Sequence, residues 1–213
     1  GTLGLGSLAI GVVGLVPLSA SGSGETSRPN IVFILTDDQG YGDAAAFGHP
    51  YLKTPNLDRL RREGRWFQNF YCPSAVCTPS RAGFMTGQFP ARHRLHAHIA
   101  NTNPGLDEAR DMASQLDPKA DNLARILQSS GYRTAHIGKW HLGYEVPPSE
   151  YGFDVAKTAV GPGPSLFSYE ETDAPHMNHK VTSAIADEAV RFIGSEGSKA
   201  DKPFFLQVWT TLP

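Results

Sequence analysis

Residues 30–38 read Asn-Ile-Val-Phe-Ile-Leu-Thr-Asp-Asp, and this stretch decides the fold class. Its apolar part is β-branched and aromatic, without alternating polar residues. A strand of this kind is buried on both faces, as in a parallel sheet covered by helices. The two carboxylates that follow would then stand at the carboxyl edge of the sheet, where open α/β sheets bind ligands.

Helices and strands alternate along the rest of the chain. Thr54 as cap and Pro55 predict a helix that Gly64 ends, and the pair Thr78-Pro79 predicts a second helix that ends near Gly87. The remaining expected elements are an extended piece at 66–71, a helix capped by Asp121 and stopped by Gly131, a strand at 132–137, a helix at 180–193, a strand at 204–209, and long loops at 101–119 and 144–178. This alternation predicts an α/β layered domain.

The beginning of the chain has a different character. Leu3 to Leu18 is apolar and uncharged, and Ser19-Ala20-Ser21 follows it, which resembles the later part of a secretory signal peptide. We exclude residues 1–27 from the fold as a signal-peptide remnant and linker. The alternative is a buried or membrane-anchoring helix, although the run is short for a bilayer span.

Export and partner class follow from the bulk properties. The leader predicts a secreted or periplasmic protein that is not integral to the membrane. The 213 residues suffice for one substantial domain, and a formal net charge of −2 gives no sign of a nucleic-acid partner.

Adjacent carboxylates at Asp37 and Asp38 repel each other unless a cation or hydrogen-bond donors offset their charge. A hard divalent cation with oxygen ligands would do so, and an all-protein cage suits calcium better than magnesium. Taken alone, the pair fits a solvated turn equally well.

Cys77 directly precedes the helix that Thr78-Pro79 predicts, so it lies beside a helix amino terminus. Unpaired N–H groups and the helix dipole favour an anion there, and Arg81 in the first turn can reach the same place. A nucleophile among these positive groups suits an anionic ester, although the local pattern also fits a small buried cysteine. The second cysteine, Cys72, is expected to be a packed thiol without a disulfide to Cys77.

Residues 131–143 read Gly-Tyr-Arg-Thr-Ala-His-Ile-Gly-Lys-Trp-His-Leu-Gly. On an extended chain Lys139 and His141 point to one face, and Trp140 points to the core. A cation beside a titratable base suits an anionic substrate. A basic strand end that faces solvent is the alternative.

Together these motifs resemble the formylglycine-dependent, arylsulfatase-like sulfatase family of the alkaline-phosphatase-like superfamily. Cys77-Thr78-Pro79-Ser80-Arg81 resembles the family's Cys-x-Pro-x-Arg modification signature, and residues 131–143 are similar to its second signature. Residues 28–38 look like its opening strand and metal loop, and residues 54–60 are also typical. The resemblance spans residues 28–213, which are identified as the amino-terminal part of a sulfatase catalytic domain.

The resemblance implies an alkaline-phosphatase-like α/β sandwich with a mostly parallel central sheet flanked by helices, incomplete in this chain. It also implies that a formylglycine-generating enzyme oxidises Cys77, and that Asp37, Asp38 and the modified Cys77 bind one Ca²⁺. One hydroxyl of the hydrated aldehyde would attack sulfur while Arg81 and Lys139 hold the sulfate oxygens. His141 would then deprotonate the second hydroxyl so that sulfate is expelled.

The resemblance places further family residues beyond Pro213: a leaving-group acid, an Asp/Asn pair for calcium and another Lys. The chain is therefore expected to be a truncated sulfate-ester hydrolase that is inactive by itself. Sulfated carbohydrates are the expected substrates, because exported enzymes meet sulfated polysaccharides, and His96 and His98 are substrate-binding candidates or exposed loop residues. The rival interpretations are a phosphonate or phosphodiester hydrolase of the same superfamily and a non-catalytic fragment.

Overall fold

The computed structural model describes residues 11–14, 28–99, 104–166, 180–196 and 202–213. In chain order its elements are β1 (Gly11–Gly14), β2 (Ile31–Leu35), the 3-10 helix η1 (Ala45–Phe47), α1 (Pro55–Glu63), α2 (Cys77–Thr86), η2 (Pro90–His93), α3 (Pro104–Ala109), α4 (Leu123–Ser129), β3 (Arg133–Lys139), η3 (Pro148–Tyr151), β4 (Val155–Val160), α6 (Val181–Glu196) and β5 (Phe204–Trp209). Strands and helices alternate over most of this length, as the sequence predicts.

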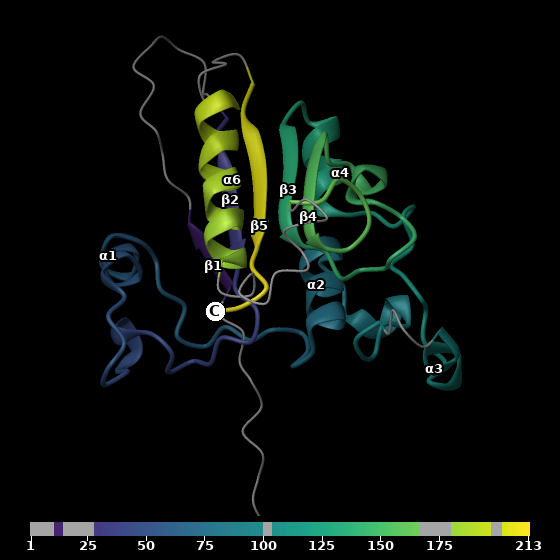
Figure 1. Cartoon of the computed structure of the whole chain (residues 1–213), viewed down its shortest axis with the longest axis horizontal. Coiled ribbons are helices and arrows are strands. Elements are labelled where there is room, and N and C mark those ends of the chain that lie inside the picture. The colour runs from purple at the N-terminus through teal and green to yellow at the C-terminus, as the bar shows by residue number, and fades with distance from the viewer. Residues whose placement is uncertain (1–10, 15–27, 100–103, 167–179, 197–201) are drawn as a thin grey trace, which may run out of the picture.

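The described strands form one sheet in the order β1-β2-β5-β3-β4 (Figure 1). β1 pairs antiparallel with β2, and every other neighbouring pair is parallel. The last strand in the chain, β5, therefore lies between β2 and β3, with Trp209 in register with both Leu35 and Gly138. Since parallel strands point the same way, the carboxyl ends of β2, β5 and β3 meet at one edge.

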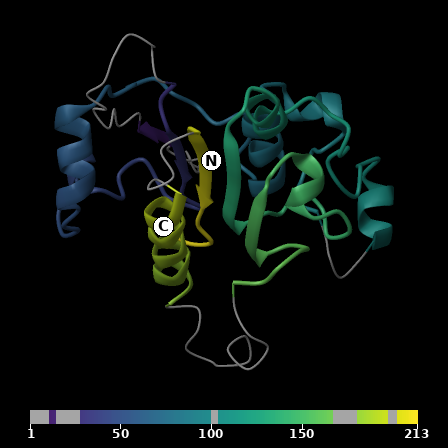
Figure 2. The same ribbon diagram turned by 90° about the horizontal axis from the view of Figure 1, so that it is seen from above.

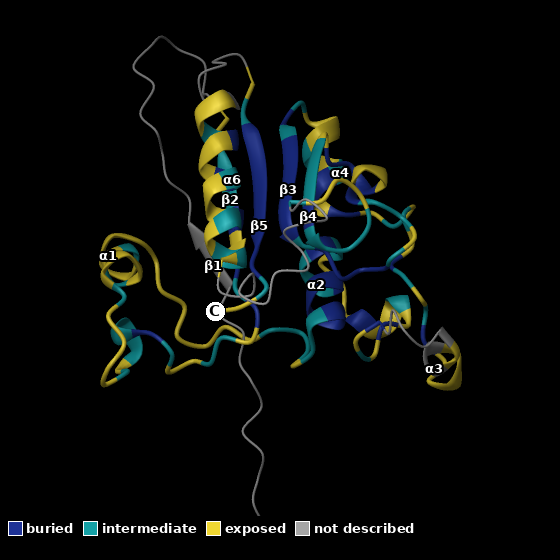
Figure 3. Ribbon diagram, in the orientation of Figure 1, coloured by how far each residue is buried: buried dark blue, intermediate teal, exposed yellow. Residues whose placement is uncertain are grey.

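Helices cover both faces of this sheet (Figure 2). On β5, Phe204, Leu206 and Val208 pack toward α6, in a cluster with Ile185 and Phe192. The alternate residues Phe205 and Trp209 face the opposite side, in a larger cluster that includes Ala82 of α2 and Ala124 of α4. All six residues of β5 are buried (Figure 3). The predicted sheet, mostly parallel and flanked by helices, is confirmed.

Helix α1 packs differently from the helices that cover the sheet. None of its residues is buried, and Leu57 is 37% exposed. The helix lies apart from the sheet and packs beside η1 (Figure 1). Thr54 is its N-cap residue, as expected, although its side chain makes no capping hydrogen bond; Oγ1 accepts from the Ala45 amide and donates to the Asp58 carboxylate.

Two other expected caps are wrong. Helix α2 begins at Cys77, with Val76 as its N-cap, because the Thr78 hydroxyl bonds elsewhere. Helix α4 is capped by Asn122 instead of Asp121, and the Asn122 side chain accepts from the Arg125 amide. The expected strand at 132–137 runs over Arg133–Lys139 and the helix at 180–193 over Val181–Glu196, while residues 66–71 form neither helix nor strand.

The two expected loops contain regular structure. Helix α3 lies in the first, and η3 and β4 lie in the second, where β4 extends the sheet beside β3. Residues 101–103 and 167–178 of these predicted loops lie outside the described residues.

The expectation for residues 1–27 also differs from the structure in one respect. Gly11–Gly14 form β1 against β2, whereas the whole segment was expected outside the fold. Strand pairing uses backbone groups, so a glycine-rich run can supply it. The rest of the segment lies outside the described residues, and the signal-peptide interpretation stays a prediction. Within the described part of the chain, no helix combines the length and the apolar character that a bilayer span needs.

Candidate active site

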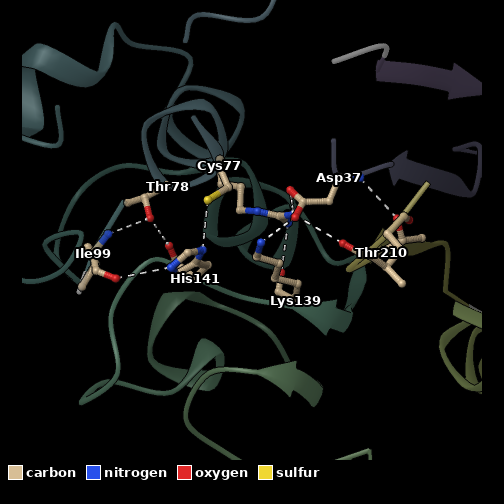
Figure 4. A network of polar contacts seen from close by, with 9 residues as sticks. Asp37, Cys77, Thr78, Ile99, Lys139, His141 and Thr210 are labelled. Carbon is tan, nitrogen blue, oxygen red and sulfur yellow. Dashed lines mark hydrogen bonds and ion pairs between the residues drawn. The ribbon is translucent and has the colours of Figure 1, made fainter. Parts of the chain in front are cut away.

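Three strand ends and one helix bring the predicted site residues together. Asp37 follows β2, Lys139 is the last residue of β3, and Thr210 follows β5. Arg81 lies four residues after Cys77 on α2 and donates hydrogen bonds to all three of these residues. Figure 4 shows Asp37, Lys139 and Thr210 together with Cys77. This location, outside the carboxyl ends of parallel strands, is where open α/β sheets bind ligands.

The carboxylate of Asp37 is held between two cations. Nη2 of Arg81 donates to its Oδ1 over 2.9 Å, and Nζ of Lys139 donates to its Oδ2 over 2.5 Å. The Asp37 amide donates to Oγ1 of Thr210 over 3.4 Å. One carboxylate balances only one of the two cations, so these three side chains together carry a positive charge. An anion is therefore favoured beside them.

Arg81 is almost completely buried, at 1% exposure. Its Nη1 donates to the Lys139 carbonyl over 3.0 Å, and its guanidinium lies 4.8 Å from the ring centre of Trp209. Burial lowers the pKa of Arg81, and the Asp37 charge opposes that shift, so the guanidinium stays charged. Its Nε has no hydrogen-bond partner among the described residues.

Cys77 and His141 face each other at the amino end of α2. Sγ of Cys77 lies 3.2 Å from Nδ1 of His141, and Nε2 of the same ring lies 3.4 Å from the Ile99 carbonyl oxygen. His141 has a φ of 53°, an uncommon conformation for a residue with a side chain. Burial first, and then the positive charge of Lys139, lower the pKa of His141 to about 4. The ring is therefore neutral at neutral pH.

A cleft opens beside Cys77. Its lining consists of Leu35, Thr36, Asp37, Asp38, Gln39, Ser74, Ala75, Val76, Cys77, Ser80 and Arg81. Lys139 and His141 are not part of this lining. Instead, Lys139 contacts Asp37 and His141 contacts Cys77, so each of them adjoins a residue of the lining.

The residues expected to bind calcium supply some, but not all, of the oxygen donors that the cation needs. Asp37, Asp38 and Gln39 line the cleft together with Cys77, and carboxylate and amide oxygens suit Ca²⁺. However, both oxygens of Asp37 already accept from Arg81 and Lys139. Among the residues that the structure describes, no group of three acidic, Cys or His side chains is arranged to hold a metal ion. The donor set therefore supplies a portion of the six to eight oxygens that Ca²⁺ takes.

The structure brings five of the predicted residues close together, in two groups. Asp37, Arg81 and Lys139 contact one another, Cys77 contacts His141, and Asp37, Cys77 and Arg81 line the same cleft. Asp38 is exposed, with a φ of 56°, at the mouth of the cleft.

His96 and His98 lie outside both groups. Both are exposed on the segment that ends at Ile99, and within the described residues no hydrogen bond or ion pair joins either ring to Cys77. Cys72 and Cys77 are not joined by a disulfide.

Three contacts escape the sequence analysis. The carbonyl of Thr210 accepts from Arg81 and its hydroxyl accepts from the Asp37 amide, although the sequence identifies Thr210 only as the residue after a strand. The hydroxyl of Thr78 contacts the backbones of His141 and Ile99, whereas the Thr-Pro pair predicts a cap. The carbonyl of Ile99 is a backbone group, for which the sequence carries no signal.

Solved structures share this fold. Ps i-CgsB in complex with k-i-k-neocarrahexaose has a TM-score of 0.70 and 25% sequence identity, over 88% of this chain and 46% of that chain. BT4656 in complex with its substrate D-glucosamine-2-N,6-O-disulfate has a TM-score of 0.63 and 29% identity, over 88% and 35%. The phosphonate monoester hydrolase of Agrobacterium radiobacter, at a TM-score of 0.56 and 23% identity over 87% and 41%, shares the fold alone. The fold and the grouping at its strand ends define a domain of the alkaline-phosphatase-like class.

Within that class, residues 29–212 match the sulfatase family, and the chain belongs to it. It is 37% identical over 145 residues to N-acetylgalactosamine-6-sulfatase of Sus scrofa, which covers 66% of this chain and 28% of the relative. It is 44% identical over 124 residues to arylsulfatase A of Bos taurus, which covers 58% and 23%. The chain spans about a quarter of the length of these curated relatives.

Proposed function

We propose that the full-length protein hydrolyses sulfate esters with Cys77, converted to formylglycine, as its nucleophile. One observation carries the proposal: Sγ of Cys77 stands at the amino end of α2, 3.2 Å from Nδ1 of a neutral His141, and lines one cleft with Arg81. A nucleophile, a proton acceptor and a cation thus converge where an anionic ester would bind. Membership of the sulfatase family supports this assignment.

Formylglycine would supply what a thiol lacks. Its formation removes sulfur and oxidises Cβ to an aldehyde, so a formylglycine-generating enzyme is the implied partner. The hydrated aldehyde carries two hydroxyls on one carbon. One would attack sulfur, which releases the alcohol of the ester and leaves a sulfate ester on residue 77, and the other would be deprotonated so that the aldehyde re-forms and sulfate leaves.

The chain's own residues bind the anion and move the proton. Arg81 and Lys139 offer positive charge to the sulfuryl oxygens, and they do so from a mostly buried position, where charge is weakly screened. The lowered pKa of His141 keeps its ring neutral, so Nδ1 can accept a proton from a hydroxyl on residue 77.

Asp37 and Asp38, with the side chain at position 77, would hold one Ca²⁺, and Gln39 lies in the same lining. The cation would add positive charge next to the sulfuryl oxygens. To bind it, Asp37 would share its oxygens between the cation and the two basic side chains that now contact it.

Sulfated carbohydrates are the substrate class that we propose. The relatives named N-acetylgalactosamine-6-sulfatase and the solved structure with D-glucosamine-2-N,6-O-disulfate support this choice. His96 and His98 are the proposed substrate-binding residues, since they are exposed on the segment that leads to Ile99 beside His141. Export to the periplasm or outside the cell remains part of the proposal.

The test uses the full-length protein produced with a formylglycine-generating enzyme. Mass spectrometry of the peptide that contains Cys77 is expected to show the aldehyde and its hydrate, and the variant Cys77→Ser is expected to lose turnover of an aryl sulfate. Parallel kinetics with an aryl phosphonate ester separate the rival activity. An unmodified thiol in a fully active enzyme, or faster turnover of the phosphonate, would overturn the proposal.

A further inference from the structure

Thr78 connects three segments that are far apart in the sequence (Figure 4). Its side chain is completely buried. Oγ1 donates to the His141 carbonyl oxygen over 3.0 Å and accepts from the Ile99 amide over 3.2 Å. A threonine hydroxyl has one proton to donate, so these contacts use its donor on His141 and an acceptor site for Ile99. Helix α2 is thereby joined to the loop after β3 and to the segment before residue 100.

Ile99 completes a closed set of contacts. Its amide donates to Thr78, while its carbonyl oxygen lies 3.4 Å from Nε2 of His141. A carbonyl can only accept a hydrogen bond, so in the neutral ring Nε2 carries the proton. Nδ1 then has a lone pair, and it is the nitrogen that faces Cys77 over 3.2 Å. Which nitrogen of a histidine is protonated is set by the partner of the other one.

We propose that Thr78 is a positioning residue for His141: its hydroxyl holds the His141 and Ile99 backbones so that Nε2 donates to Ile99 and Nδ1 presents its lone pair to the side chain at position 77. Its effect on turnover rests on the proposed function, whereas its effect on the ring does not.

The backbone at His141 shows why such a restraint matters. A φ of 53° is uncommon for a residue with a side chain, so surrounding contacts help to select it at His141. Thr78 bonds the carbonyl of that same residue. The helix itself does not need this hydroxyl, because the side chain makes no cap and α2 begins at the preceding residue.

The key variant is Thr78→Val, which keeps the shape of the side chain and removes the hydroxyl. Thr86→Val is the matched control: Thr86 ends the same helix, and its hydroxyl donates to Ala82 within that helix. Thr78→Ser restores the hydroxyl. Because Thr78 lies inside the modification signature, all rates in the full-length enzyme are divided by the formylglycine content measured by mass spectrometry.

With an aryl sulfate, Thr78→Val is expected to lower the corrected kcat by about ten- to a hundredfold, with KM changed less than about threefold. Thr78→Ser is expected to stay within about threefold of the parent enzyme, and so is Thr86→Val. If Thr78→Val does not fold, Thr78→Ala, which fits the same space, carries the same expectation. A Thr78→Val or Thr78→Ala enzyme as fast as Thr86→Val, or a Thr78→Ser enzyme as slow as Thr78→Val, would overturn the proposal.

The ring itself gives a readout that does not depend on turnover. In the full-length protein labelled with ¹⁵N-histidine, the His141 signals, assigned by their loss in His141→Gln, are expected to show a proton on Nε2. Removal of the Thr78 hydroxyl is expected to give a mixture of the two tautomers, while Thr86→Val keeps one. An unchanged tautomer refutes the positioning role. A parent enzyme without sulfatase activity refutes the proposed function and leaves this comparison intact.

Discussion

The guanidinium of Arg81 and the carboxylate of Asp37 form a buried ion pair, with Nη2 2.9 Å from Oδ1 and side chains that are 1% and 8% exposed. The pair joins helix α2 to the loop after β2. In a buried pair the cost of removing both charges from water can exceed their attraction, so the pair need not stabilise the fold by itself. Loss of one partner is different, because it leaves the other charge buried and uncompensated.

We therefore expect Asp37→Asn to lower the free energy of unfolding by about 3–5 kcal/mol, since Arg81 would remain buried without its counter-ion. Arg59→Ala is the control, because Arg59 and Glu63 form an exposed pair on α1 whose loss costs about 0.3–0.5 kcal/mol. Urea unfolding of the two variants measures both values. Equal effects of the two substitutions would contradict the assignment of Arg81 as a buried cation.

Gly138→Ala is expected to destabilise the protein by at least about 3 kcal/mol. Gly138 has a φ of +117°, and an added Cβ would lie 1.9 Å from the carbonyl oxygen of Trp209 on the neighbouring strand. The register of β3 against β4 shifts at Gly138 and Lys139, so this close approach shapes the strand end that presents Lys139.

The control for that variant is Gly194→Ala on α6, where no atom lies within 4 Å of the added Cβ. It is expected to raise stability by about 0.5–1 kcal/mol, because alanine loses less backbone entropy in a helix. Thermal unfolding compares the two variants. If Gly138→Ala unfolds at or above the temperature of the parent protein, the close approach to Trp209 is wrong.

The sequence predicts the sheet well because its central strands carry strong local signals. β2 is a continuous apolar run and β5 is apolar apart from Gln207, and a strand buried on both faces needs such a pattern. β4 escapes prediction, since Val155–Val160 is a partly buried strand at the edge of the described sheet, with Lys157 and Thr158 in its middle.

The candidate site, like the sheet, can be predicted from the sequence only in part. Side chains with strong chemistry, such as Cys77 and Arg81, can be predicted from their motifs. The way they are held cannot, because it depends on backbone groups such as the Ile99 carbonyl and on the left-handed backbone of His141. Thr78 is an example, because a Thr-Pro pair favours a helix cap, whereas the hydroxyl of Thr78 forms tertiary hydrogen bonds instead.

His136 is expected to make stability depend on pH. It is completely buried among Trp140, Phe153 and Trp209, and Nε2 of Gln207 lies 2.9 Å from its Nδ1. Burial, helped by the charge of Arg81, lowers the pKa of His136 to about 3. Between that value and about 6.5 the unfolded chain binds a proton that the folded protein does not, so stability is complete above about pH 6.5 and falls as the pH drops toward 3.

The slope from this one residue is at most about 1.4 kcal/mol per pH unit. His136→Gln is expected to reduce the slope of unfolding free energy between pH 6 and pH 4.5 by nearly one bound proton, whatever its effect at pH 7. Thr86→Val, which changes no ionisable group, is the control and should leave the slope unchanged. Urea unfolding over a pH series measures this, and identical slopes in parent and His136→Gln would refute it.

Calcium is expected to stabilise the full-length protein through Asp38. A ligand that binds only the folded state adds about 2.7 kcal/mol at a concentration one hundred times its Kd. Calcium chloride should therefore raise the Tm, a chelator should reverse the rise, and Asp38→Asn should abolish it. Since Asp38 is exposed, the variant should match the parent in chelator, and Asp187→Asn on α6 should keep the full calcium response. A calcium response that survives Asp38→Asn would exclude this carboxylate as a ligand.

The exposed histidines are expected to affect carbohydrate substrates and not small ones. His96 and His98 lie on the segment that ends at Ile99, and neither contacts Cys77 through a hydrogen bond or ion pair within the described residues. The double variant His96→Ala/His98→Ala should therefore raise KM for a sulfated oligosaccharide by about tenfold, because interactions with remote parts of a substrate add to binding. With an aryl sulfate, which lacks the further sugar units of an oligosaccharide, kcat and KM should stay within about twofold. His49→Ala, on the loop before α1, is the control and should change neither substrate. If the double variant slows both substrates alike, the two histidines support the site itself; if it slows neither, the carbohydrate binds elsewhere.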